Sequence, residues 1–177
     1  MSISRASPWT QRALESSMTS PNERRLARIS ALQALYELDT TGHAADGVIA
    51  YRLEEQPMTP DGEAFLRLLV SSVLKQRAAL DARIQRHAPA WPVAQIAVID
   101  RNILRIALIE LAGLTGTPPK VAINEAVDLA KMFGSDSSSR FVNGVLGAVV
   151  DEHVEADPAG PPSDVEPRPE ARVQAKD

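Results

Sequence analysis

The amino-acid sequence predicts an all-α protein, and three observations lead to this prediction. Apolar residues recur at intervals of three, four and seven along most of the chain, which is the period of an amphipathic helix. Hydrophobic residues make up 44% of the 177 residues and aromatic residues only 4%, so we expect an interior of aliphatic side chains on packed helices. No segment shows the strict alternation of apolar and polar residues that predicts a strand.

Three helices are predicted in the first half of the chain. The first starts near Asn22, because Ser20 offers a capping hydroxyl, and it stops before Gly42. A weaker helix follows at about 45–55, and the longest helix runs from 61 to about 87. Their apolar residues fall on one face in each case, so all three are expected to pack against a shared core.

Three more helices are predicted in the second half, after prolines break the chain near residue 91. The first two run at about 98–114 and 119–133, and the second of them starts at a proline pair, which suits a first helical turn. The last runs to about 154, and the serines within 135–138 offer several N-caps for its start. Gly134 suits a left-handed residue that ends a helix, and Gly144 suggests that another backbone passes close to the last helix.

The ends of the chain differ in composition from its middle. Residues 1–21 are polar and rich in serine, and residues 157–177 are rich in proline and acidic residues. We expect a flexible arm and a disordered tail, because neither segment can bury enough apolar surface to offset its conformational entropy. The helical domain is then 22–156, divided into subdomains at about 22–90 and 91–156.

Several classes of function find no support in the sequence. The chain has no cysteine, its three histidines are scattered, and no nucleotide-binding or nucleophile motif occurs, so no catalytic, metal or cofactor site is predicted. The most apolar internal stretch, 96–114, contains four charged residues, so no membrane span is predicted either. The first twenty residues lack the apolar run of a signal peptide, and we expect a cytosolic protein.

One local concentration of positive charge stands out in a chain of net charge −4. Arg24, Arg25 and Arg28 lie on the first turns of the first helix, and Arg5 and Arg12 lie upstream. Such a cluster is more often a solvated helix face than an RNA site. Arginines at a helix start oppose the helix dipole slightly, however, which suggests a reason for them other than helix stability.

Three stretches of the second half, read together, resemble the carboxy-terminal half of the NusB family. They are ILRIALIEL at 103–111, PKVAINEAVDLAKMFG at 119–134 and RFVNGVL at 140–146. The segment RRLARISALQALY at 24–36 resembles the first helix of that family. The resemblance covers about residues 22–153, although residues 40–95 agree in helical layout and in little else.

This resemblance implies a fold and a function. The NusB fold has about seven helices in two small orthogonal bundles. NusB proteins bind the single-stranded boxA element of ribosomal RNA leaders together with the ribosomal protein NusE, and the complex helps RNA polymerase read through terminators. The resemblance therefore implies a non-catalytic RNA-binding factor in antitermination of ribosomal RNA operons.

The resemblance also implies two sets of site residues. The expected RNA-binding residues are Arg24, Arg25, Arg28, Gln33, Lys131, Phe133, Arg140 and Phe141. Arginine and lysine would contact phosphates, Gln33 a base edge, and the two phenylalanines would stack on bases or pack in the core. The expected protein-partner residues are Tyr36, Asp100 and Arg101.

A NusB-like chain could have two other functions. A NusB-like domain of an RNA methyltransferase would need a nucleophilic cysteine and a catalytic domain, and the sequence offers neither. A NusB-like scaffold that binds only protein stays open, because the chain is acidic and Leu26 interrupts the arginine run. The family commonly has Asp-Ser in its last inter-helix turn, whereas this chain has Ser137 and Ser138 there, so a contact carried over to Ser137 is in doubt.

Overall fold

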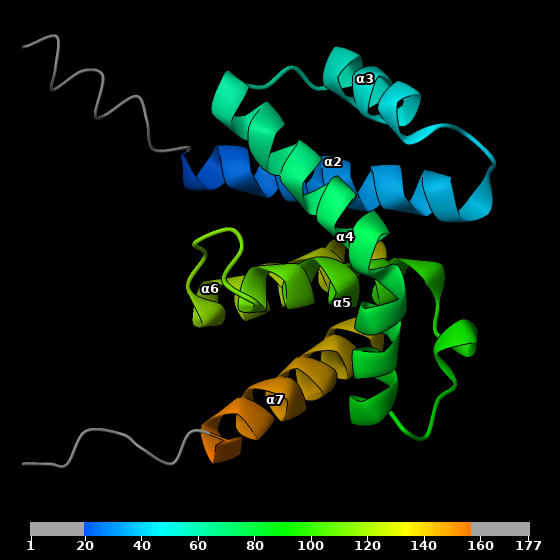
Figure 1. Ribbon diagram of the computed structural model, residues 1–177, viewed down its shortest axis with the longest axis vertical. Helices are drawn as coiled ribbons and strands as arrows, with labels where there is room; N and C mark the ends of the chain where they lie inside the picture. Colours follow the sequence, from blue (N-terminus) through cyan, green and yellow to red (C-terminus); the bar gives the residue numbers. More distant parts are fainter. Residues whose placement is uncertain (1–19, 157–177) are drawn as a thin grey trace, which may run out of the picture.

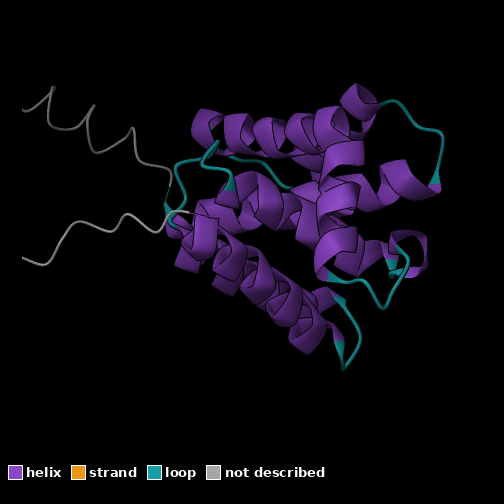
Figure 2. Cartoon of the chain, turned by 60° about the horizontal axis from the view of Figure 1, so that its bottom comes forward, coloured by secondary structure: helices purple, strands orange, loops and turns teal. Residues whose placement is uncertain are grey.

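The computed structural model describes residues 20–156 and confirms the all-helical prediction (Figure 1). Figure 2 shows only helices and loops in this part of the chain. Most of the arm predicted at 1–21 and the whole tail predicted at 157–177 lie outside the described residues. The described elements are α2 (Pro21–Thr40), α3 (Ala45–Glu55), α4 (Pro60–His87), the short 3-10 helix η1 (Val93–Gln95), α5 (Val98–Leu111), α6 (Pro119–Phe133) and α7 (Ser138–Ala156).

Two of the helices start at capping residues of the sequence. The Ser20 hydroxyl accepts a hydrogen bond from the Glu23 amide at the start of α2, at 3.2 Å. The Thr59 hydroxyl accepts from the Gly62 amide at the start of α4, at 3.3 Å. Helix α5 ends three residues earlier than the sequence predicts, because the chain turns at once through Gly113, whose φ is +80°.

The helices surround one continuous hydrophobic core, with α5 at its centre. Helix α2 crosses α4 and also packs on α5, while α6 and α7 pack on α5 and on each other (Figure 1). Every residue of α5 from Asn102 to Glu110 is buried. Leu32, Leu66, Ile103 and Leu146, from four different helices, are each 0% exposed and belong to the same core.

A buried arginine on α5 joins three helices. Arg105 is 3% exposed, and its Nη1 lies 2.8 Å from Asp39 Oδ2 at the end of α2. Its Nε and Nη2 donate to the two carboxylate oxygens of Asp81 on α4, at 2.7 and 2.8 Å. A two-pronged contact of this kind is the favoured geometry of an arginine with a carboxylate. The charges therefore fix α2 and α4 against the middle of α5.

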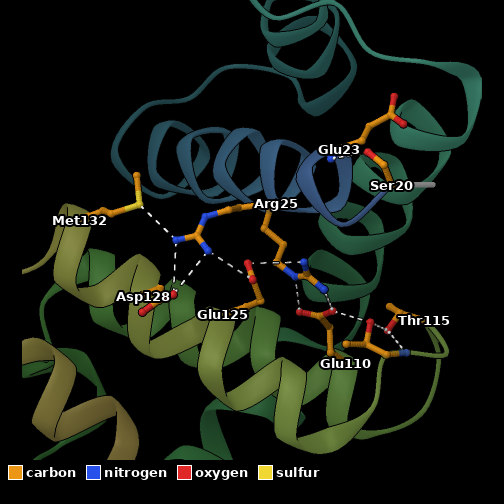
Figure 3. A network of polar contacts seen from close by, with 10 residues as sticks. Ser20, Glu23, Arg25, Glu110, Thr115, Glu125, Asp128 and Met132 are labelled. Atoms are coloured by element: carbon orange, nitrogen blue, oxygen red, sulfur yellow. Dashed lines mark hydrogen bonds and ion pairs between the residues drawn. The ribbon is translucent and has the colours of Figure 1, made fainter.

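A second buried arginine corrects the sequence analysis. Arg28 was predicted on an exposed helix start, but it is 3% exposed and donates to both oxygens of Glu110 on α5, at 3.0 and 2.7 Å. The Thr117 hydroxyl donates to the same carboxylate at 2.7 Å. Figure 3 shows this network between α2, α5 and α6. The physical reason is helical spacing, because the buried residues Ala31 and Leu32 follow Arg28 at intervals of three and four.

Both expectations about glycine need correction. Gly134 has φ −90° and ψ −172°, which is extended and not left-handed. Its smallness is what the turn requires, because a Cβ there would lie 2.7 Å from the Ala130 carbonyl oxygen and would overlap the Ser138 side chain. Gly144 has open space within 4 Å of the position of a Cβ, so no backbone passes close to it.

Replacing Arg28 by alanine is expected to lower the free energy of unfolding by about 3–5 kcal/mol, because the Glu110 carboxylate would stay buried without its partner. Urea denaturation at neutral pH measures this change. The double variant Arg28→Met with Glu110→Leu should recover most of the loss. Arg67→Ala is the control, since its pair with Glu63 is exposed and should contribute less than about 1 kcal/mol. An equally small loss for Arg28→Ala would contradict the buried-pair interpretation.

The two glycines should respond in opposite directions to alanine. Gly134→Ala is expected to destabilise the protein by about 1–3 kcal/mol, because the added methyl group overlaps backbone and Ser138. Gly144→Ala should stabilise it by up to about 1 kcal/mol, because the site is exposed, helical and open. Thermal unfolding of the two variants beside the wild type checks both signs, and a shift of the same sign in both would refute this account of the turn.

Candidate nucleic-acid interface

The start of α2 presents two of its three arginines at the surface. Arg24 is partly exposed, its guanidinium lies 5.1 Å from the Phe65 ring centroid, and it has no carboxylate partner among the described residues. Arg25 reaches α6, where Nη1 lies 3.3 Å from Glu125 Oε1 and 3.4 Å from Asp128 Oδ2 (Figure 3). The arginine cluster of the sequence thus divides into one buried, one paired and one unpaired side chain.

Asp128 connects the start of α2 to the end of α6. Lys131 Nζ lies 3.2 Å from its Oδ1, while Arg25 donates to its Oδ2. The hydrogen bond from Lys131 lowers the pKa of Asp128, burial opposes this, and Arg25 lowers the pKa further. The carboxylate therefore keeps its negative charge at neutral pH and offsets part of the positive charge of both cations.

A first hollow lies beside the exposed face of α2, and we call it the Tyr36 hollow. Its volume is about 370 Å³. The predicted residues Gln33, Tyr36 and Phe133 line it together, from α2 and the end of α6. Tyr36 is 44% exposed. The other lining residues are Leu32, Glu37, Thr40, Arg52 and Ile99.

A second hollow lies at the turn between α6 and α7, and we call it the Trp91 hollow. Its volume is also about 370 Å³, and it brings together the predicted residues Asp100, Arg140 and Phe141. Its remaining lining residues are Trp91, Gln95, Ile96, Ala97 and Ser137. Trp91 was not among the predicted site residues. The missed signal is a large aromatic residue in a proline-rich turn, outside any apolar helix face.

Two of the three predicted protein-partner residues lie largely inside the structure. Asp100 is 7% exposed, and the Ser138 hydroxyl donates to its Oδ2 at 2.9 Å. Burial raises the pKa of the Asp100 carboxyl, although this hydrogen bond lowers it. Arg101 has a side chain that is 17% exposed, and its Nη1 donates to the Val93 carbonyl at 3.3 Å. Tyr36 is the predicted partner residue with the largest free surface.

Phe133 and Phe141 pack in the core, which is one of the two roles that the sequence left open, while their stacking on bases stays a prediction. Both rings are half-buried and pack against the hydrophobic core. Phe133 also lines the Tyr36 hollow and Phe141 lines the Trp91 hollow. Each ring therefore contributes to the core and also lines a hollow.

Residues 131–141 connect these features in space. Lys131 shares the Asp128 carboxylate with Arg25, so it lies close to the start of α2. Phe133 lines the Tyr36 hollow, and Arg140 lines the Trp91 hollow. The described helices contain no segment long and apolar enough to cross a membrane. Within residues 20–156 no three side chains of the metal-binding types are grouped so that they could hold an ion.

Comparison with known proteins gives a consistent result. The family model described as "NusB family" matches residues 25–151. The transcription antitermination protein NusB of Roseiflexus sp. (strain RS-1) is 53% identical over 134 residues, which cover 75% of this chain and 94% of the relative. The protein of the same description from Chloroflexus aggregans is 50% identical over 135 residues, covering 75% and 90%.

A solved structure agrees in fold as well as in sequence. It is described as the crystal structure of antitermination factors NusB and NusE in complex with dsRNA, and the matched chain is 26% identical with a TM-score of 0.68. The match covers 75% of this chain and 99% of the other. The predicted fold and the predicted family are both confirmed, and this chain belongs to the NusB family.

Proposed function

We propose that this chain is a non-catalytic transcription antitermination factor that acts on ribosomal RNA operons in the cytoplasm. It binds boxA-type single-stranded RNA together with a NusE-type small-subunit ribosomal protein, as part of the antitermination complex on RNA polymerase. The names of the relatives support antitermination. The solved complex of a related chain supports joint binding of RNA and a NusE-type protein.

The observation that carries the RNA part of this proposal is the path of residues 131–141. This segment leads from the start of α2 past the Tyr36 hollow to the Trp91 hollow. Cations and aromatic rings alternate along it, in the order Lys131, Phe133, Arg140 and Phe141. Arg24, Arg25, Lys131 and Arg140 would bind phosphates. Along the same path Gln33 would reach a base edge, and Phe133 and Phe141 would stack on unpaired bases. Arg28 is left out of this set because it is buried in the Glu110 pair.

The protein partner is assigned to Tyr36 and to the end of α2 that lines the Tyr36 hollow with it, Glu37 and Thr40, while Gln33 and Phe133 at the same hollow are assigned to RNA. An exposed tyrosine beside a hollow can anchor a partner through apolar contact and a hydroxyl hydrogen bond. Arg101 would support this surface from behind, because its Nη2 lies 3.6 Å from Asp39 Oδ2 near the end of α2, and Asp100 follows Ile99, which lines the hollow. The two hollows share the start of α5, since Ile99 lines one and Asp100 lines the other.

The pairing of the cations predicts that RNA binding depends on the partner. Arg25 and Lys131 share Asp128, and Arg25 also contacts Glu125. A phosphate must compete with these carboxylates for the same guanidinium and ammonium groups. We therefore expect modest RNA affinity for the isolated chain and a clear gain when the ribosomal protein adds its own contacts.

A protein-binding scaffold without sequence-specific RNA binding is the second candidate. The net charge of −4 and the carboxylates beside Arg25 favour it. The two functions differ in a titration of the chain with its partner against boxA-type RNA and a scrambled RNA. A preference for the boxA-type RNA supports the factor, and equal weak binding of the two RNAs supports the scaffold.

The salt dependence of that titration tests the phosphate contacts. Three to five contacts predict a log–log slope of roughly −2 to −4 for the complex. The double variant Arg24→Ala with Arg140→Ala should flatten the slope by about 1.4, since each lost contact to a single strand accounts for about 0.7. The control variant Lys75→Ala with Arg86→Ala removes two exposed cations from α4 and should leave the slope unchanged. An unchanged slope in the first variant would exclude both arginines from the site.

Asp128→Asn is expected to strengthen RNA binding about 2- to 5-fold, because it frees Arg25 and Lys131 from an exposed ion pair of less than about 1 kcal/mol. The dissociation constant of the complex with boxA-type RNA measures the change. Glu54→Gln removes one exposed negative charge from α3 and serves as the control for net charge. Weaker binding of Asp128→Asn, or an equal gain in both variants, would contradict a phosphate site at Arg25 and Lys131.

A further inference from the structure

Trp91 is a large aromatic residue that lies outside the hydrophobic core. Its side chain is 58% exposed, in the connection between α4 and η1. The backbone at this point is held in place, since the Trp91 amide donates to the Ala88 carbonyl at 3.1 Å and Gln85 Nε2 donates to the Trp91 carbonyl at 3.2 Å. The ring is therefore presented to solvent by an ordered turn.

The surroundings of Trp91 form a small site of mixed chemistry. Phe141 supplies a second aromatic ring in the same hollow, in a chain that has few aromatic residues. Arg140 is exposed and has no carboxylate partner among residues 20–156. Asp100 is 7% exposed, and its Oδ1 is a buried acceptor without a hydrogen-bond partner in the described part of the chain.

These groups together fit a nucleotide. Aromatic rings stack on the flat face of a base, and a free guanidinium binds the adjoining phosphate. Three residues of the segment 131–141, along which RNA runs in the proposed function, also line the hollow: Ser137, Arg140 and Phe141.

We propose that Trp91 is a base-stacking residue, which holds one unpaired base of the RNA in the Trp91 hollow beside Phe141 while Arg140 binds the adjoining phosphate. This inference rests on the proposed function and adds a residue and a position to it. Trp91 contributes affinity without charge, so its effect differs from that of the arginines.

The first test uses substitutions at Trp91 in the full chain with its ribosomal-protein partner and boxA-type RNA. Trp91→Ala should weaken RNA binding about 5- to 140-fold, the equivalent of roughly 1–3 kcal/mol for one stacked base. The salt slope should stay unchanged, because stacking releases no counterions. Trp91→Phe should retain most of the affinity. Tyr51→Ala removes another exposed ring, on α3, and should have no effect.

A second measurement tests whether a base of the RNA contacts the Trp91 ring. In a Trp9→Phe background Trp91 is the only tryptophan of the chain, so a 5-fluorotryptophan label reports on it alone. Its fluorine resonance should shift when boxA-type RNA binds. A series of RNAs, each with one abasic position, should show one position whose loss weakens binding to the wild type but has little further effect on Trp91→Ala.

The outcomes separate this inference from the proposed function. Absence of boxA preference in the wild-type complex would overturn the proposed function and this inference together. Normal boxA binding by Trp91→Ala, with no fluorine shift in the Trp9→Phe protein, would overturn only the role of Trp91. Weaker binding of Trp91→Ala to the ribosomal protein without RNA would show that the hollow is a protein site, and would also overturn it.

Discussion

Arg28 and Arg105 are charged groups in the interior, and the position of α2 follows from the need to pair them. Each is 3% exposed, and each meets carboxylates from another helix. Arg28 joins the start of α2 to Glu110 near the end of α5, while Arg105 on α5 joins Asp39 near the end of α2. A buried charge without a partner is very costly, so these contacts fix α2 along α5 in both position and direction.

The same contacts connect the fold to the proposed binding surface. Glu125 lies 3.6 Å from the buried Arg28 and 3.3 Å from the exposed Arg25. Asp128, one turn later on α6, holds Arg25 and Lys131. Structural and binding charges therefore belong to one network, and a substitution in it can change RNA affinity by moving α2 instead of by removing a contact (Figure 3).

Helical period and the positions of proline and glycine were sufficient to predict the six described α-helices, because these are local properties of the chain, whereas the short η1 was not predicted. Properties that depend on tertiary packing were harder to predict. Arg28 was placed outside, although its spacing to Ala31 and Leu32 puts it on the buried face. Gly134 was expected for its backbone angle and is required for its size, which only the neighbouring Ser138 and Ala130 reveal. The Trp91 hollow joins residues about fifty positions apart, so no local pattern could predict it.

The central claim is that RNA follows residues 131–141 from the start of α2 to the Trp91 hollow, while the ribosomal protein binds at Tyr36 and the end of α2. Photocrosslinking tests it most directly, with boxA-type RNA that carries 4-thiouridine and with the crosslinked peptides identified by mass spectrometry. The account predicts crosslinks in residues 131–141, at the start of α2 and at Trp91. Crosslinks confined to α3 or to the solvent-exposed face of α4 would contradict it.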